Sequence, residues 1–180
     1  MVRDVVELLS PRAHAAGLDI AVRTAPGSPR QAVGDAGRIR QILFNLVGNA
    51  LKFTESGAVL IDIAPTPDGV YYRVIDTGTG IAPEDRDRLF EAFRQSTASD
   101  AQKDGGVGLG LAIVGRLVDA LGGEISVSGR QGSGTEFRVD LPLRPAVKPN
   151  SGEAKLDQAT SRGERIGLAG LPPATALSAA

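Results

Sequence analysis

A stripe of polar side chains is the first feature of this sequence that points to chemistry. Between Asp35 and Thr54, polar residues recur at steps of three or four, which at about 100° per residue places them along one side of a helix. The stripe consists of Arg38, Gln41, Asn45, Asn49 and Lys52. Asparagine is a poor helix former, so two of them in mid-helix indicate a specific role. Amide oxygens beside a lysine can hold a hydrated divalent cation and a phosphate; the alternative is a solvated polar face.

The helix that must carry this stripe is amphipathic. Its apolar residues also repeat at three- and four-residue steps, which is typical of a helix packed on a core. They are Ile39, Ile42, Leu43, Leu46, Val47, Ala50 and Leu51. Asp35 is the expected N-cap. Because the polar stripe adjoins the apolar one, its side chains should lie at the rim of the core.

A second candidate is the segment D-T-G-T-G-I, which begins at Asp76 directly after a predicted strand at 70–75. It places a carboxylate on a glycine turn that a planar ligand can approach closely. Such a carboxylate can accept a hydrogen bond from the exocyclic amine of adenine, with Ile81 packed on the base. An ordinary D-x-G turn after a strand is the alternative.

Two glycine-rich segments complete the set. Residues 105–110, G-G-V-G-L-G, stand before a predicted helix, where free backbone N–H groups and the helix dipole suit a phosphate. This segment is neither a G-x-x-x-x-G-K-S/T loop nor a convincing dinucleotide fingerprint, and a flexible hinge is the alternative. The segment Gly132 to Thr135 is favoured, taken alone, as a hairpin turn.

The remaining pattern predicts an α+β fold. We expect a helix over 2–17 that Pro11 kinks or divides and Gly17 ends, and a loop over 24–34. Strands are expected at 18–22, 58–63, 70–75, 125–127 and 135–141, the second and third as an antiparallel hairpin. A short helix should begin at Pro83 and run towards Phe90, and the segment 105–110 should open another helix. This order predicts a two-layer α/β sandwich, a mixed sheet covered on one face by helices.

The texture of the chain changes near its end. Residues 144–180 are rich in Pro, Ala, Gly and Ser and contain almost no aromatic residues. This composition is typical of a flexible linker or a disordered tail. We therefore predict a folded domain over residues 1–143 and a tail over 144–180.

Composition excludes several kinds of site and partner. The chain of 180 residues has a formal net charge of -1, so no basic field indicates nucleic acid or an anionic membrane. It has no cysteine, which excludes disulfides, thiol chemistry and cysteine-based zinc sites, and His14 cannot build a metal site alone. No apolar run approaches the roughly 18 residues of a membrane span, and the charged start is not typical of a signal peptide. These features fit a cytoplasmic protein.

The order of the motifs resembles the catalytic ATP-binding domain of sensor histidine kinases. Five segments match that domain's N, G1, F, G2 and G3 boxes, and the likeness covers about residues 2–143. They are N-L-V-G-N-A-L-K-F, D-T-G-T-G-I, L-F-E-A-F-R-Q, G-G-V-G-L-G-L-A-I-V and G-S-G-T-E-F. The resemblance implies the Bergerat fold, shared with gyrase, MutL and the heat-shock chaperone ATPases, and the cofactors ATP and Mg²⁺.

The resemblance also implies a role for each matching residue. Asn49 would bind Mg²⁺ through its amide oxygen, with Asn45 assisting the metal or its water. Lys52 and Arg94 would meet the phosphates, and these two with Asn45 would be the catalytic residues. The adenine pocket would consist of Phe53, Asp76, Gly78, Gly80, Ile81 and Thr135. The phosphate chain would lie against Gly106, Val107, Gly108, Leu109 and Gly110, and residues 94–107 would form a lid.

Two departures from the family pattern bear on function. Val107 stands where a hydroxyl-bearing residue is common, and the helical hairpin with the phosphoaccepting histidine is absent. His14 lacks that motif's context and is expected on a helix surface. The implied function is transfer of the γ-phosphoryl group of ATP to a histidine on a separate dimerisation and phosphoacceptor domain, with a response regulator as an indirect partner.

Two other functions stay open. A non-catalytic, ATP-dependent interaction module would need the same nucleotide site. A Bergerat-type hydrolase is disfavoured, because such enzymes place a glutamate, which activates water, where this chain has Asn45.

Overall fold

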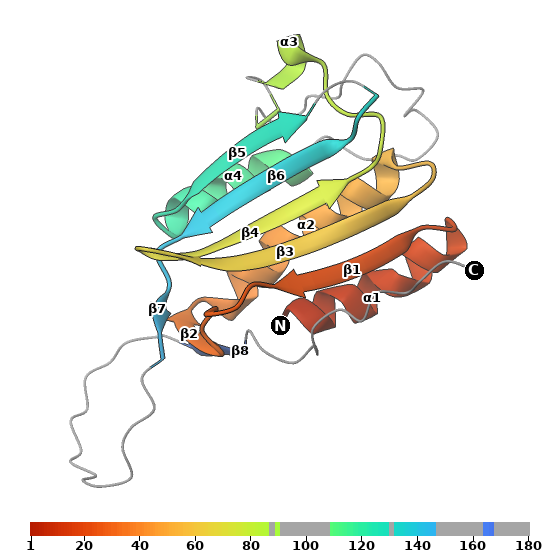
Figure 1. Cartoon of the computed structure of the whole chain (residues 1–180). Helices are drawn as coiled ribbons and strands as arrows, with labels where there is room; N and C mark the ends of the chain where they lie inside the picture. Colours follow the sequence, from red (N-terminus) through yellow and green to blue (C-terminus); the bar gives the residue numbers. More distant parts are fainter. Residues whose placement is uncertain (87–88, 91–108, 130–131, 147–163, 168–180) are drawn as a thin grey trace, which may run out of the picture.

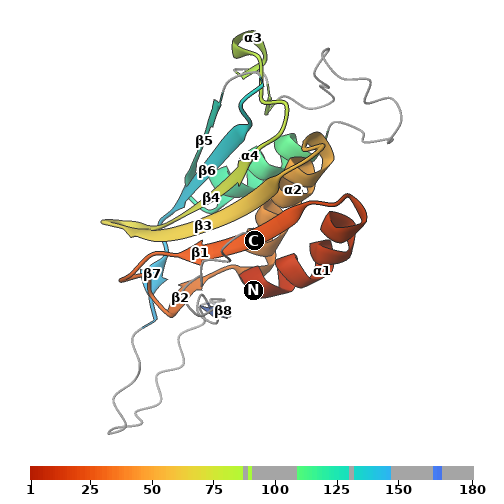
Figure 2. The same cartoon turned by 45° about the vertical axis from the view of Figure 1, so that its right-hand side comes forward.

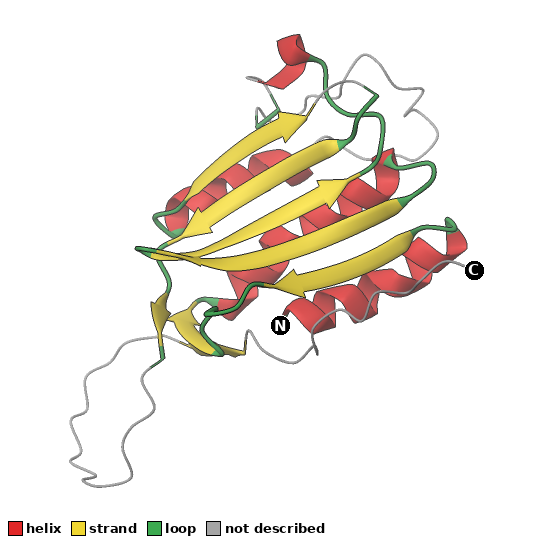
Figure 3. Ribbon diagram, viewed as in Figure 1, coloured by secondary structure: helices red, strands yellow, loops and turns green. Residues whose placement is uncertain are grey.

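A mixed five-stranded sheet with helices on one of its faces forms the centre of the fold (Figures 1 and 3). The computed structural model describes residues 1–86, 89–90, 109–129, 132–146 and 164–167. The helices are α1 (Val2–Ala15), α2 (Ala36–Phe53), α3 (Pro83–Arg86) and α4 (Gly110–Ala120). The strands are β1 (Asp19–Thr24), β2 (Gln31–Gly34), β3 (Ala58–Thr66), β4 (Gly69–Asp76), β5 (Glu124–Gly129), β6 (Thr135–Leu141), β7 (Arg144–Pro145) and β8 (Glu164–Gly167).

Strand pairing confirms the predicted α+β class. The order in the large sheet is β1-β3-β4-β6-β5, with β1 parallel to β3 and the other neighbours antiparallel. The β3–β4 hairpin forms as predicted, although its strands run further into the turn than the sequence suggested. Figure 2 shows α1, α2 and α4 on the same side of the sheet. The result is a two-layer sandwich with one open sheet face.

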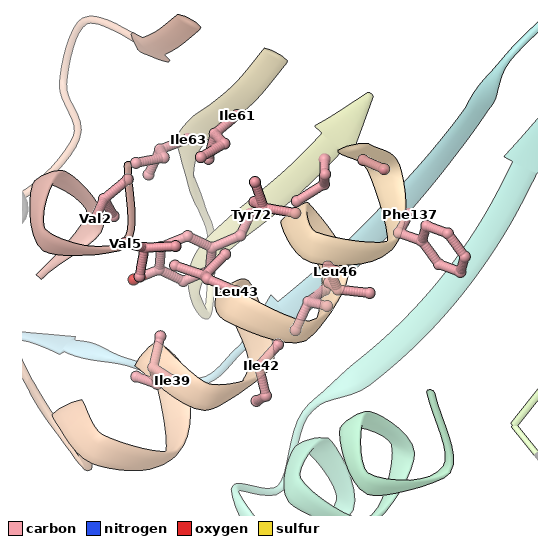
Figure 4. Packing of buried hydrophobic residues seen from close by; sticks show 14 of the residues in the cluster. Val2, Val5, Ile39, Ile42, Leu43, Leu46, Ile61, Ile63, Tyr72 and Phe137 are labelled. Atoms are coloured by element: carbon pink, nitrogen blue, oxygen red, sulfur yellow. The ribbon is translucent and has the colours of Figure 1, made fainter. Parts of the chain in front are cut away.

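Helix α2 lies in the middle of the helical layer. Its predicted apolar stripe is buried, with Ile39, Leu43 and Leu46 fully enclosed. Figure 4 shows Leu43 close to Val5 of α1 and to Tyr72 of β4, while Leu46 lies towards Phe137 of β6. The side chain of Asp35 accepts a hydrogen bond from the backbone N–H of Arg38 at 3.0 Å, which confirms the N-cap. Burial of the stripe fixes the rotation of α2 and therefore the direction of its polar rim.

Helix α1 differs from the expectation in one respect. It continues through Pro11, which neither ends nor divides it. The helix ends at Ala15, and Gly17, with a φ of +67°, stops it as predicted. The N–H of Leu18 donates to the carbonyl of Ala13 at 2.9 Å, and the N–H of Gly17 donates to the carbonyl of His14 at 3.0 Å. These two bonds form a Schellman cap, which satisfies carbonyls of the last turn. His14 is exposed on this last turn, as expected.

Strand β2 corrects the predicted loop over 24–34. This short strand is paired on both sides by segments from the far end of the chain, β7 and β8. Such a strand has little local signal, because non-local backbone pairing and not an apolar run stabilises it. Residues 144–145 and 164–167 of the predicted tail are therefore strands, while 147–163 and 168–180 lie outside the described residues. The domain boundary at 143 stays a prediction.

The open face of the sheet carries an ionic network. Asp62 of β3 is only 2% exposed and accepts hydrogen bonds from Arg23 Nε at 2.7 Å and Arg73 Nε at 3.0 Å. The hydrogen bond from Arg23, opposed by desolvation, keeps the pKa of the Asp62 carboxyl below its usual range. The pairs tie β1, β3 and β4 together on the side away from the helices.

Candidate functional site

Asp76, the last residue of β4, is a buried carboxylate at the edge of the helical layer. Asp76 is only 6% exposed. Its Oδ1 accepts hydrogen bonds from the backbone N–H groups of Gly78 at 2.9 Å and Thr135 at 3.1 Å. Burial raises the pKa of this carboxyl, and the bonds from Gly78 and Thr135 act in the opposite direction. The carboxylate is thus held in one orientation by the loop that follows it and by the start of β6, which is far away in the sequence.

The loop after Asp76 lies directly against the C-terminal end of α2. A Cβ atom on Gly78 would stand 2.2 Å from the backbone oxygen of Phe53, so no larger residue fits without movement. The same oxygen accepts the N–H of Thr79 at 3.2 Å. This close approach gives a steric reason for the glycine and places the ends of α2 and β4 side by side.

The turn before β6 closes the other side of the loop. The N–H of Gly132 donates to the carbonyl of Thr79 at 2.6 Å. Gly134 has a φ of +81°, and a Cβ there would lie 2.0 Å from the backbone oxygen of Asp76. The segment 132–135, which alone indicated only a turn, therefore delivers the Thr135 amide to Asp76.

The polar rim of α2 meets the start of α4. Asn45, Asn49 and Lys52 are half-buried, as expected for the edge of a core, whereas Arg38 and Gln41 of the predicted stripe are exposed. A Cβ on Gly110, the first residue of α4, would lie 3.9 Å from Nδ2 of Asn49, so the helix N-terminus stands beside that amide. The Lys52 ammonium is 5.4 Å from the centroid of the Phe53 ring. Phe53 as a whole is 39% exposed. An amide, an ammonium and free helix N–H groups can together contact an anion and a hydrated cation.

The predicted site residues are thus largely placed. Asp76, Gly78 and Thr135 are in direct contact, Phe53 joins them through its carbonyl, and Asn49 adjoins Gly110. Gly80 and Ile81 follow in the loop, with Ile81 partly buried against the core, and Leu109 directly precedes α4. The other predicted site residues, Arg94, Gly106, Val107 and Gly108, and the lid over 94–107, lie outside the described residues.

The structure also shows supporting residues that the sequence did not single out. Thr54 is buried, and its hydroxyl donates to the carbonyl of Ala50 at 2.7 Å while facing Gly78. Thr77 bonds through its side chain to the segment before β3. A threonine after a helix or after an aspartate is too common for the sequence alone to reveal these roles.

Acidic and histidine side chains supply no alternative centre in the part of the chain that the structure describes. No group of three His, Cys, Asp or Glu residues there could hold a metal ion. Among the same residues, no helix combines the length and the apolar character needed to cross a membrane. The contacts described above make the convergence of α2, α4 and the Asp76 loop the candidate site.

Comparisons with known proteins agree with the motif order. Residues 34–145 match the family described as histidine kinase-, DNA gyrase B- and HSP90-like ATPase. The sensor kinase BarA of Escherichia coli K12 is 39% identical over 151 residues, which is 80% of this chain and 16% of BarA. The sensor protein GacS of Pseudomonas syringae is 40% identical over 151 residues, covering 81% of this chain and 17% of GacS. The chain therefore spans about a sixth of these relatives.

Solved structures show the same fold. Full-length ShkA, crystallised with AMPPNP, is 47% identical with a TM-score of 0.72 over 82% of this chain and 30% of ShkA. The catalytic domain of the histidine kinase ThkA is 28% identical with a TM-score of 0.67, over 78% of this chain and 90% of that domain. The buried aspartate, the asparagine rim and these matches lead to one conclusion: the chain belongs to the histidine kinase-, DNA gyrase B- and HSP90-like ATPase family, as a catalytic domain of the sensor histidine kinase type.

Proposed function

We propose that this domain binds ATP with Mg²⁺ and transfers the γ-phosphoryl group to a histidine on a separate dimerisation and phosphoacceptor domain. A single observation carries the proposal. One end of the fold brings together a buried base-reading carboxylate, Asp76, and an amide rim at Asn49 beside the N-terminus of α4. A nucleoside triphosphate needs both kinds of contact at once.

The base end of the site suits adenine. With Oδ1 of Asp76 fixed by two backbone donors, the carboxylate presents further acceptor capacity to an exocyclic amine. The exposed ring of Phe53 offers an apolar face for the base, and Ile81 a second apolar contact. Gly78 and Gly80 keep side chains out of the loop, and Thr135 completes the polar contact.

The phosphate end of the site suits Mg²⁺. Mg²⁺ retains several waters and takes few protein ligands besides phosphate oxygens, so an amide oxygen of Asn49, assisted by Asn45, is a sufficient protein contribution. The half-burial of both amides fits such a site. The bound ion would neutralise phosphate charge during transfer. Lys52 supplies a positive charge, and Gly110 an N–H group at the helix start, where amides lack intrahelical acceptors.

The reaction would depend mainly on positioning and charge neutralisation. The imidazole nitrogen of the acceptor histidine would form a bond to the γ-phosphorus as the bond to the β–γ bridging oxygen breaks, and ADP would leave. Asn45 carries a neutral amide that cannot remove a proton from water. That chemistry favours transfer to a held nucleophile over hydrolysis. Arg94 and the glycines at 106 and 108 are proposed phosphate contacts in the same reaction.

The same proposal implies the partners and the setting. The acceptor domain would dock directly, and a response regulator would receive the phosphoryl group from the histidine. We propose a cytoplasmic domain that contacts neither nucleic acid nor membrane, in keeping with the balanced charge of the chain.

Labelled ATP and a purified acceptor domain test the proposal. We expect label to appear on the acceptor domain only when this chain, Mg²⁺ and ATP are all present. An acceptor domain whose histidine is replaced by glutamine is the matched control and should stay unlabelled. Tight Mg·ATP binding without any transfer would favour a non-catalytic interaction module, and release of phosphate with no labelled protein would favour a hydrolase.

A further inference from the structure

Thr77 lies beside the proposed base-reading aspartate and points away from it. Its hydroxyl accepts the N–H of Ala58 at 3.1 Å and donates to the carbonyl of Ser56 at 3.2 Å. Its own N–H bonds to the carbonyl of Ala58 at 3.3 Å. One exposed side chain therefore makes two hydrogen bonds to the backbone segment that connects α2 to β3.

The segment is built to receive that hydroxyl. Gly57 has a φ of +109°, and a Cβ there would stand 2.2 Å from the Thr77 Oγ1. Only glycine gives the backbone both this conformation and this close approach. The carbonyl of Gly57 also accepts the N–H of Asp19, so the segment is anchored to the start of β1 as well.

The location of these bonds matters because the segment links two proposed base contacts. Phe53 ends α2, and Asp76 ends β4; the chain between Phe53 and Ala58 sets their separation. One end of that segment is held by the bond from Thr79 N–H to the Phe53 carbonyl, and the other end by the Thr77 hydroxyl. Without the hydroxyl, the second end would keep the backbone bonds from Thr77 and Asp19 but lose both hydrogen bonds to the Thr77 side chain.

We propose that Thr77 is a positioning residue for nucleotide selectivity, which fixes the Asp76 carboxylate relative to the Phe53 ring. This inference rests on the proposed ATP site. A hydrogen bond between a carboxylate and the adenine amine requires defined geometry, whereas stacking on a ring tolerates small shifts. Loosening the segment should therefore weaken ATP more than ITP, which lacks the amine.

Thr77→Val tests this, because valine has nearly the same shape as threonine and lacks the hydroxyl. Thr77 also borders an open depression, lined by Glu55, Ser56, Gly78 and Thr79, which leaves space for the new methyl group. Calorimetry with Mg·ATP and Mg·ITP should show an ATP Kd raised by about two- to tenfold, with ITP nearly unchanged. Thr77→Ser keeps the hydroxyl and should restore the wild-type ratio. Thr66→Val, at the opposite end of β3, is the matched control and should leave both affinities unchanged.

The outcomes separate the two proposals. If the wild-type protein binds no Mg·ATP, the proposed function fails and this inference fails with it. If the wild type binds ATP and the ATP-to-ITP ratio is the same in Thr77→Val, Thr77 has no selectivity role. Should the valine variant not fold, Thr77→Ala against Thr77→Ser gives the same comparison, and equal ratios in that pair would overturn the inference.

Discussion

Asp76→Asn separates ligand recognition from folding. Asparagine has the same shape, and its amide oxygen can still accept the N–H groups of Gly78 and Thr135 that now bond at 2.9 and 3.1 Å. The other end of the side chain changes from an acceptor to an NH₂ donor. That donor would face the donor amine of adenine, and such a mismatch costs about 1–3 kcal/mol. The Kd for Mg·ATP should therefore rise by about 5- to 150-fold.

The same substitution should not destabilise the apo protein. Burial raises the Asp76 pKa, so the fold disfavours the ionised form. At pH values between the ordinary aspartate pKa and this raised pKa, the unfolded chain binds fewer protons at Asp76 than the folded chain does. The contribution of Asp76 to the free energy of unfolding therefore falls as pH rises. In Asp76→Asn the contribution is absent, so near pH 7 the variant should be as stable as the wild type or more stable.

Calorimetry with ATP and ITP and thermal unfolding at several pH values check both halves of this prediction. ITP carries a 6-oxo acceptor, which the new amide donor can meet, so the preference for ATP over ITP should shrink or invert. An equal loss of affinity for the two nucleotides would refute base reading by Asp76. A large fall in the melting temperature of the apo variant at neutral pH would refute the idea that the ionised Asp76 carboxylate lowers the free energy of unfolding.

Three further substitutions test the site and the core. Asn49→Ala should remove most of the Mg²⁺ dependence of ATP affinity in calorimetry, and an unchanged Mg·ATP affinity would contradict the metal assignment. Gly48→Ala should raise the free energy of unfolding by about 1 kcal/mol, because a Cβ there meets nothing within 4 Å in the described structure and alanine is the better helix former. Tyr72→Phe should leave the free energy of unfolding equal or higher in urea titration, since the buried hydroxyl has no partner among the described residues, and a loss above about 1 kcal/mol would reveal one.

Much of the helical layer could be predicted from sequence because its signals are local. The apolar repeat of α2, the Asp35 cap and the Gly17 stop each lie within a few residues of the feature they specify. The position of Asn45, Asn49 and Lys52 at the rim of the core could also be predicted, because it follows from the angle between the polar and the apolar stripe of the helix. For the same reason the β3–β4 hairpin was visible, though its strand ends were not.

Features that depend on distant partners were not predictable in this way. Strand β2 has only two apolar residues and is defined by pairing with β7 and β8, more than 100 residues away in the sequence. The contact between Thr135 and Asp76 joins positions 59 residues apart, and neither segment alone signals it. Motif order supplied that link, since a family resemblance carries information on spatial proximity that spacing within one segment does not.

A backbone amide NMR titration with Mg²⁺ and a non-hydrolysable ATP analogue tests the central claim most directly. The largest shifts are expected at Gly78, Thr135 and Gly110, the amides that line the two ends of the site. Amides around the ionic network of Asp62 on the open sheet face should shift little, because that face lies on the other side of the sheet. Saturable shifts centred on the open face, with none at Gly78 and Thr135, would contradict the placement of the nucleotide site.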